Sequence, residues 1–281
     1  MKKTGYMSLR VKLLLLCLTI IIIPFTFMGV VTYYKYIDNE KLKSKEYAEQ
    51  LTRQIEMNLD RFVKDLDRVT LTTFYDELII RILRNHAGSY GGKPVFSTIV
   101  RDRMSSFLQG LVYDRNEIRA ILFFTEDGAL FSNRDALSIQ NHWLLSEQSW
   151  MSGVLDRDGG ALLLGTHEIG YFLNMATGRA VVERQQISFS RMIKDPISEK
   201  NLGILKMDLS PTGLETAFSA IRVTPGSHLE IAAADGSIVY TQNPTAATVD
   251  DDKRAVQTVS SSVYTGLTVR LTIPYEDLTL R

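Results

Sequence analysis

The chain has 281 residues, of which 45% are hydrophobic and 23% charged, a balance typical of globular proteins rather than disordered ones. Lys and Arg total 32, and so do Asp and Glu, so the chain has no net basic field and no nucleic-acid partner is expected. The single cysteine, Cys17, excludes a disulfide framework. Stability must therefore come from packing.

Residues 13–34 form an apolar segment, LLLLCLTIIIIPFTFMGVVTYY, without a charged side chain. A helix of this length spans the ~30 Å hydrocarbon core of a bilayer. Residues 1–12 are basic and contain no acidic residue, which predicts a cytoplasmic N-terminus, a single transmembrane pass and an extracellular location for residues 35–281. A cleaved signal peptide is the alternative, but the sequence that follows has no A-x-A-like site, which favours an uncleaved anchor.

Residues 35–75 are predicted to form one long juxtamembrane helix, because residues 38–75 contain neither Gly nor Pro and are rich in helix formers. Such a helix of about 40 residues would extend ~60 Å from the membrane. Apolar residues recur in it with helical spacing, at Leu51, Ile55, Leu59, Phe62, Leu66 and Val69. This stripe either packs on its own domain or forms a seam between two copies, and we predict a homodimer through this helix.

The remaining sequence alternates between strand and helix patterns. EIRAILFFTEDGALFSN predicts a β-hairpin with an Asp-Gly turn. ADGSIVY at residues 234–240 has a similar pattern, with a second Asp-Gly turn. LLSEQSWMSGVLDRDGG has helical features that end at glycines, and SPTGLETAFSAI, from Ser210, has the cap and proline of a helix start. Further strands are predicted in GRAVVERQQISFSRMI, NLGILKMDLS and YTGLTVRLTIPYEDL, and a polar stretch lies at residues 241–254. The pattern predicts a hairpin-rich α+β fold.

This order of segments resembles the extracellular double Cache sensor region of bacterial transmembrane receptors, in particular YesM-like sensor histidine kinases. SLRVKLLLLCLTIIIIPFTFMGVVTYY is similar to their first transmembrane helix, SFSRMIKD and NLGILKMDLS to distal-lobe strands, and LTVRLTIPYEDLTLR to the last proximal strand. The resemblance implies two PAS-like antiparallel-sheet lobes after the juxtamembrane helix. The membrane-distal lobe would comprise residues 76–222 and the membrane-proximal lobe residues 223–281.

The resemblance also implies a ligand site in the distal lobe. In amino-acid-binding double Cache domains, an Arg two positions before Trp-Tyr holds the ligand carboxylate, and a Tyr-x-Asp before Thr-Gly holds the ammonium. Here QSWM keeps Trp150 but has Gln148 in place of the Arg, while FLNMATG has Phe172 and Asn174 in place of the Tyr and Asp. Loss of both charged groups predicts a small uncharged polar ligand, such as a carbohydrate.

The complete set of predicted ligand-binding residues is Trp150, Gln148, His167, Tyr171, Phe172, Asn174 and Arg191. The competing interpretation of Trp150 is a core residue, which is the commoner fate of an indole in such a lobe.

No pattern in the chain predicts catalysis, a metal or a cofactor. His142 and His167 have no paired ligand at a metal-binding spacing, and DRDGG lacks the further ligands of a calcium loop. Neither a G-x-S-x-G elbow, a P-loop nor a kinase Gly-rich loop occurs. We therefore expect no enzyme in this chain, although an intact relative would carry a kinase.

The predicted function is that of the extracytoplasmic sensing region of a two-component sensor histidine kinase, which binds a small polar ligand in the distal lobe and relays a conformational change to the membrane. Two alternatives remain open. The chain is either the sensor region of a chemotaxis transducer or cyclic-dinucleotide enzyme, or a membrane-anchored scaffold with an exposed apolar patch and no small ligand.

Overall fold

The structure is a computed structural model. It describes residues 9–73, 76–86, 96–126, 128–134, 139, 148–210, 224–233, 236–243 and 255–279. The predicted helix that starts at Ser210, most of the polar stretch at 241–254, and His142 lie outside the described residues.

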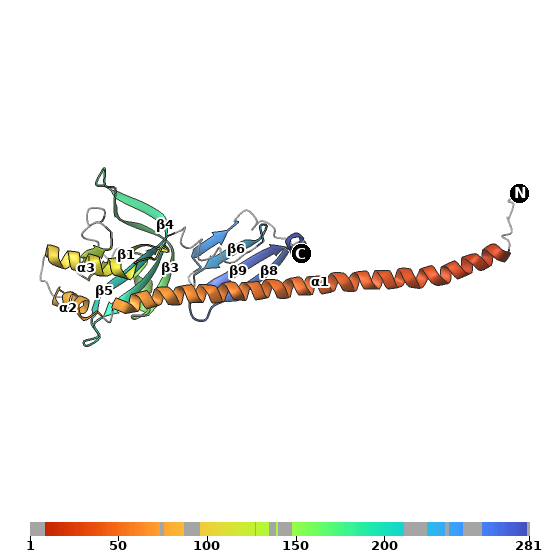
Figure 1. The fold of residues 1–281 in the computed structure, drawn as a ribbon, viewed down its shortest axis with the longest axis horizontal. Helices are drawn as coiled ribbons and strands as arrows, with labels where there is room; N and C mark the ends of the chain where they lie inside the picture. Colours follow the sequence, from red (N-terminus) through yellow and green to blue (C-terminus); the bar gives the residue numbers. More distant parts are fainter. Residues whose placement is uncertain are drawn as a thin grey trace.

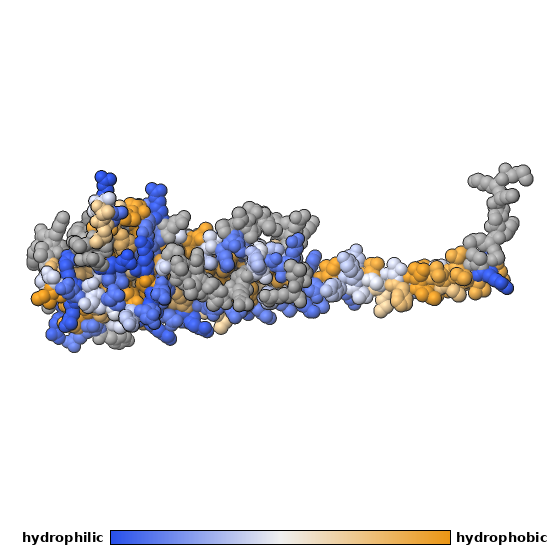
Figure 2. All heavy atoms as spheres, turned by 45° about the horizontal axis from the view of Figure 1, so that its top comes forward, coloured by the Kyte–Doolittle hydropathy of each residue, from blue (hydrophilic) through white to orange (hydrophobic). Residues whose placement is uncertain are grey.

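The N-terminal helix α1 is continuous from Leu9 to Thr72, a length of 64 residues. The predicted membrane segment and juxtamembrane helix are therefore one element, which runs through Pro24 without a break. Its N-terminal part extends far beyond the rest of the molecule (Figure 1). There α1 is long and apolar enough to cross a membrane, and none of its most apolar stretch is buried by protein. In Figure 2 the surface of this part is formed by hydrophobic side chains, so α1 is a candidate membrane span.

The distal lobe is built on a five-stranded antiparallel sheet with strand order β2-β1-β5-β4-β3. Its strands are β1 (Ile118–Phe124), β2 (Leu130–Ser132), β3 (Ala161–Leu173), β4 (Ala180–Lys194) and β5 (Asn201–Leu209). Its helices are α2 (Glu77–His86), α3 (Thr98–Leu111) and α4 (Met151–Asp156). One sheet face shares a core with α1, and the other carries a second core that includes residues of α4. We call these the α1 face and the α4 face.

The proximal lobe has a four-stranded antiparallel sheet with strand order β7-β6-β9-β8. It consists of β6 (His228–Ala232), β7 (Ile238–Gln242), β8 (Ala255–Ser261), β9 (Thr268–Pro274) and the short helix α6 (Tyr275–Thr279). In both lobes the first described strand lies between its hairpin partner and the last strand. The molecule therefore has the predicted α+β fold, with two sheet lobes behind a long apolar N-terminal helix.

The two repeated phrases form equivalent turns. The amide of Thr125 donates to the carbonyl of Ala129 at 2.9 Å, and the amide of Ala233 donates to that of Ser237 at 2.8 Å. Gly128 and Gly236 have φ of 87° and 83°, values that glycine adopts without the strain of a Cβ atom. The pattern thus occurs twice because the sheet of each lobe begins with the same type of hairpin.

The apolar stripe of α1 packs against its own lobes. Ile55, Leu59, Leu66 and Val69 are at most 6% exposed and belong to the core shared by both sheets. Ala48 is the first buried residue along the described part of α1. Intramolecular packing thus accounts for these four residues, and association of two copies through this helix stays a prediction.

Candidate functional site

The α4 face of the distal sheet carries a buried polar group within an otherwise apolar cluster. Because side chains alternate along a strand, Lys206 and Asp208 of β5 lie on the same face as Ile204, which belongs to the α4-face core. Leu205 and Met207 point to the α1-face core instead. Lys206 and Asp208 both have 0% exposed side chains. Two opposite charges are thus completely removed from water on this face.

Both oxygens of the buried Asp208 carboxylate accept hydrogen bonds. The ammonium of Lys206 donates to Oδ1 of Asp208 at 2.6 Å and to the hydroxyl of Tyr171 at 2.8 Å. The hydroxyl of Ser188 donates to Oδ1 at 2.7 Å, and that of Tyr171 donates to Oδ2. Burial lowers the pKa of Lys206, which its contact with Asp208 opposes, and burial together with Asp208 raises the pKa of Tyr171.

Aromatic rings enclose the Lys206 ammonium on its other side. The nitrogen lies 5.3 Å from the ring centre of Trp150 and 5.1 Å from that of Tyr171, within the range of cation–π attraction. Phe124 contacts both rings, with centroid distances of 5.9 and 5.8 Å. The indole Nε1 of Trp150 is buried and has no hydrogen-bond partner within the described part of the chain. A ligand acceptor would satisfy this donor.

His167 lies between this polar group and the protein surface. Its Nδ1 is 2.8 Å from the carbonyl oxygen of Gly165, and its Nε2 is 3.4 Å from the hydroxyl of Ser188. Burial, followed by the charge of Lys206, lowers the pKa of His167 to about 4. The ring is therefore neutral at pH 7, and Nδ1 must carry the proton because a carbonyl only accepts. Nε2 is left as an acceptor.

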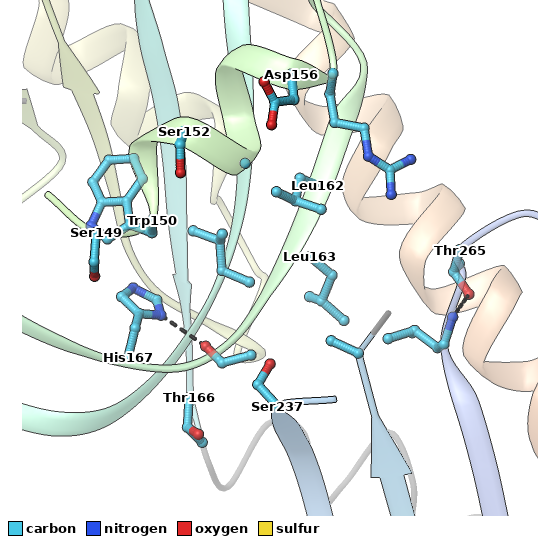
Figure 3. A pocket seen from close by; sticks show the side chains of 16 residues that line it. Ser149, Trp150, Ser152, Asp156, Leu162, Leu163, Thr166, His167, Ser237 and Thr265 are labelled. Carbon is cyan, nitrogen blue, oxygen red and sulfur yellow. Dashed lines mark hydrogen bonds between the residues drawn. The ribbon is translucent and has the colours of Figure 1, made fainter. Parts of the chain in front are cut away.

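A cavity of about 480 Å³ opens beside Trp150 and His167, at the junction of the two lobes. Figure 3 shows α4 and β3 on the distal side and Ser237 and Thr265 on the proximal side. Its polar lining consists mainly of hydroxyl groups, together with one carboxylate and one guanidinium, and these residues are Ser149, Ser152, Thr166, Ser237, Thr265, Asp156 and Arg157. Such a lining, without excess charge, suits a small polar ligand.

The cavity contains two of the predicted ligand-binding residues, and a third lies behind it. Trp150 and His167 line its wall. Tyr171 is 1% exposed and forms part of the buried polar group. Gln148 comes just before α4, where its carbonyl accepts from the amide of Met151 at 3.1 Å.

Phe172 and Asn174 do not line the cavity. Phe172 is buried, and the guanidinium of Arg119 stacks 5.0 Å from its ring centre. Asn174 is exposed in the β3–β4 turn, where its Oδ1 accepts from the amides of Ala176 and Thr177 at 2.9 and 3.1 Å. That turn uses the side chain of Asn174 locally.

Arg191 connects the distal sheet to α1. Its guanidinium donates to the hydroxyl of Thr70 at 2.9 Å, to the carbonyl of Gly159 at 2.9 Å and to the carboxylate of Asp67. These bonds place it on the α1 face, opposite the buried polar group. Its contacts indicate a structural role.

The sequence prediction did not include Lys206, Asp208 and Ser188. The available signal was a lysine and an aspartate two positions apart in the apolar run NLGILKMDL. Alternation usually places such residues on a solvated face, but here both faces of the strand are covered. Among the described residues, no group of three or more His, Cys, Asp or Glu side chains could hold a metal ion.

Comparison with known proteins supports the fold. No protein-family model matches the sequence, and a search of curated proteins finds no match. The solved sensory domain of the Campylobacter jejuni chemoreceptor Tlp3, with isoleucine bound, has a TM-score of 0.53 at 9% identity and covers 86% of this chain and 97% of its own.

Two further solved structures belong to other signalling proteins. A domain of a candidate sensory box/GGDEF protein from Vibrio parahaemolyticus has a TM-score of 0.58 at 11% identity. The extracellular domain of the candidate histidine kinase vpHK1S-Z8 has a TM-score of 0.59 at 10% identity. Both comparisons cover 86% of this chain and 99% of the other. At such identities the likeness shows a shared fold: this chain folds like the sensory and extracellular domains of these proteins.

Proposed function

We propose that this chain is the extracytoplasmic sensor region of a YesM-like two-component sensor histidine kinase. Residues 13–34 would cross the membrane with the N-terminus in the cytoplasm, and the two lobes would lie outside. The fold that the chain shares with sensory domains supports the sensor role, and the resemblance of its first helix to those of YesM-like kinases favours this output. The catalytic work of the intact receptor would belong to a separate kinase module.

The observation that carries the proposal is the cavity between the lobes. Trp150 and His167 provide an aromatic face and a neutral acceptor on the distal side, while Ser237 and Thr265 provide hydroxyls on the proximal side. A small uncharged polar ligand matches this lining, and a carbohydrate is the class that best uses an indole face together with hydroxyl partners. A ligand there would contact both lobes.

The signal would be a change in how the lobes sit on α1. A ligand shifts a conformational equilibrium only through its difference in affinity for the two states, and a site shared by two lobes provides such a difference. Both sheets pack on α1, so a movement of the lobes would reach the membrane through this helix. We propose that two copies associate along the part of α1 that precedes Ala48.

A thermal-shift screen of residues 35–281 against neutral sugars, amino acids and organic acids tests this function. The fragment keeps all described buried residues of α1, because these begin at Ala48. A ligand at 100 times its Kd should add ~2.7 kcal/mol of stability, which corresponds to a shift of several degrees. We expect a neutral polar compound to stabilise the parent fragment but not Trp150→Ala.

The matched control is Arg184→Ala, because the Arg184 side chain is 84% exposed and does not line the cavity. This variant should respond to the ligand like the parent. No response to any compound would argue for a scaffold or protein-sensing role instead. Stabilisation by an amino acid would contradict the proposed ligand class.

A further inference from the structure

The surroundings of the Lys206 ammonium have the composition of an amine-binding site. A carboxylate oxygen lies at 2.6 Å, a hydroxyl oxygen at 2.8 Å, and the centres of two aromatic rings at 5.3 and 5.1 Å. A free organic ammonium ion is recognised by the same combination of an anion, a hydrogen-bond acceptor and aromatic faces. In this protein the cation comes from the chain itself.

Stability alone gives little reason for this arrangement. Desolvation of a buried ion pair offsets most of the attraction between its charges. A protein in which such a pair is replaced by apolar side chains of similar volume is often equally stable. Lys206 and Asp208 are completely buried within an apolar cluster. The pair also lies directly behind Trp150, which lines the cavity, so it determines what can bind on the inner side of that ring.

We propose that Lys206 is the specificity-determining residue of the sensor site, because its ammonium permanently fills an amine subsite formed by Asp208, Tyr171 and Trp150. The inference rests on the proposed function and deepens it. With the subsite filled, Asp208 already accepts hydrogen bonds from Lys206, Ser188 and Tyr171, and the Lys206 ammonium occupies the position of a ligand cation. Ligands that carry a primary ammonium group are therefore excluded, and neutral polar ligands are left to use the cavity wall.

The test removes the Lys206 side chain beyond Cβ and supplies the missing atoms as a free ion. Lys206→Ala removes three methylene groups and the ammonium, which together correspond to n-propylammonium. The full chain in detergent is heated with and without n-propylammonium chloride. At ten times its Kd, the ion should raise the Tm of Lys206→Ala by roughly 4 °C. The parent protein should not respond, because its own lysine fills the subsite.

Three controls make this test specific. The neutral analogue 1-propanol should stabilise Lys206→Ala less than n-propylammonium does. Lys206→Ala combined with Asp208→Asn should lose the response. Lys194→Ala should not respond, because Lys194 pairs with Asp158, whose side chain is 83% exposed. Equal shifts in all proteins, or no ammonium-specific shift in Lys206→Ala, would overturn the proposal.

A second measurement applies if Lys206→Ala does not fold. Lys206→Met keeps most of the side-chain volume but removes the cation beside Asp208, so the amine subsite predicts strong coupling in a double-mutant cycle with Asp208→Asn. The unfolding constant of the double variant should differ at least tenfold from the additive value, and additivity would refute the amine subsite. Failure of the ligand screen on the parent protein would contradict the proposed function and leave these results unaffected.

Discussion

His167 gives the site a pH dependence whose sign follows from its environment. Its pKa in the folded protein is about 4, below the ordinary value of 6.5. As the pH falls, the unfolded chain therefore binds a proton first. The stability that depends on neutral His167 is complete above pH 6.5 and is lost as the pH falls towards 4.

Denaturant unfolding of residues 35–281 at pH 7 and pH 5 measures this effect. The parent should lose roughly 2 kcal/mol more than His167→Gln between these two pH values. The comparison with the variant removes the contribution of other titrating groups. Identical losses in the two proteins would show that His167 is accessible to protons in the folded state.

At the residue scale, two of the residues predicted to bind a ligand, Trp150 and His167, line the cavity. Asn174 and Arg191 were also predicted, but hydrogen bonds hold their side chains elsewhere. Lys206 was missed because strand alternation cannot tell which faces of a sheet are covered.

Among the elements, α1 is joined by polar contacts at matching intervals to the edge strand β8 and to Ser262, which directly follows it. Thr52 contacts Thr258, Glu56 accepts from Ser260, and Asp60 accepts from Ser262 at 2.6 Å. Four helical residues advance ~6 Å and two strand residues ~6.6 Å, so the same pairing recurs along both elements. These contacts cover the edge of the proximal sheet and fix its position along α1.

Asp60 should contribute more to stability than a surface carboxylate of the same helix. It accepts hydrogen bonds from Ser262 and, at 3.3 Å, from Thr265, which both belong to the turn before β9. Asp60→Ala should therefore cost about 1–3 kcal/mol. Asp65→Ala is the control and should cost less than ~0.5 kcal/mol, because its partner Arg68 is 78% exposed. Equal urea midpoints for both variants would contradict this role of Asp60.

The sequence predicted most elements and their division into two sheet lobes, but not which elements contact one another. The Asp-Gly hairpins and the helical stripe of α1 followed from turn chemistry and periodicity, both of which act locally. The union of the two predicted N-terminal helices into α1 follows from the absence of a strong helix breaker near residue 35. The contact between β8 and α1 depends on residues some 200 positions apart, and local patterns carry no information on it.

At the scale of the whole molecule, the lobes approach each other closely where β3 meets the β6–β7 turn. A Cβ atom added to Gly165 would lie 1.9 Å from Oγ and 2.7 Å from Cβ of Ser237. Gly165→Ala should therefore push the lobes apart and destabilise the protein by about 1–3 kcal/mol. Ser237→Gly should restore most of this loss in the double variant. Urea unfolding measures both effects, and failure of the second change to rescue the first would show that the lobes do not meet at this point.

The central claim is that the cavity between the lobes is the ligand site of a sensor. Hydrogen exchange of the full chain in nanodiscs, with and without a pool of neutral monosaccharides, tests it most directly. We predict slower exchange in α4, in residues 161–167 of β3, and in the proximal turns at Ser237 and Thr265. The turn at Asn174 should not change. Unchanged exchange throughout, or protection confined to surfaces outside the cavity, would contradict the claim.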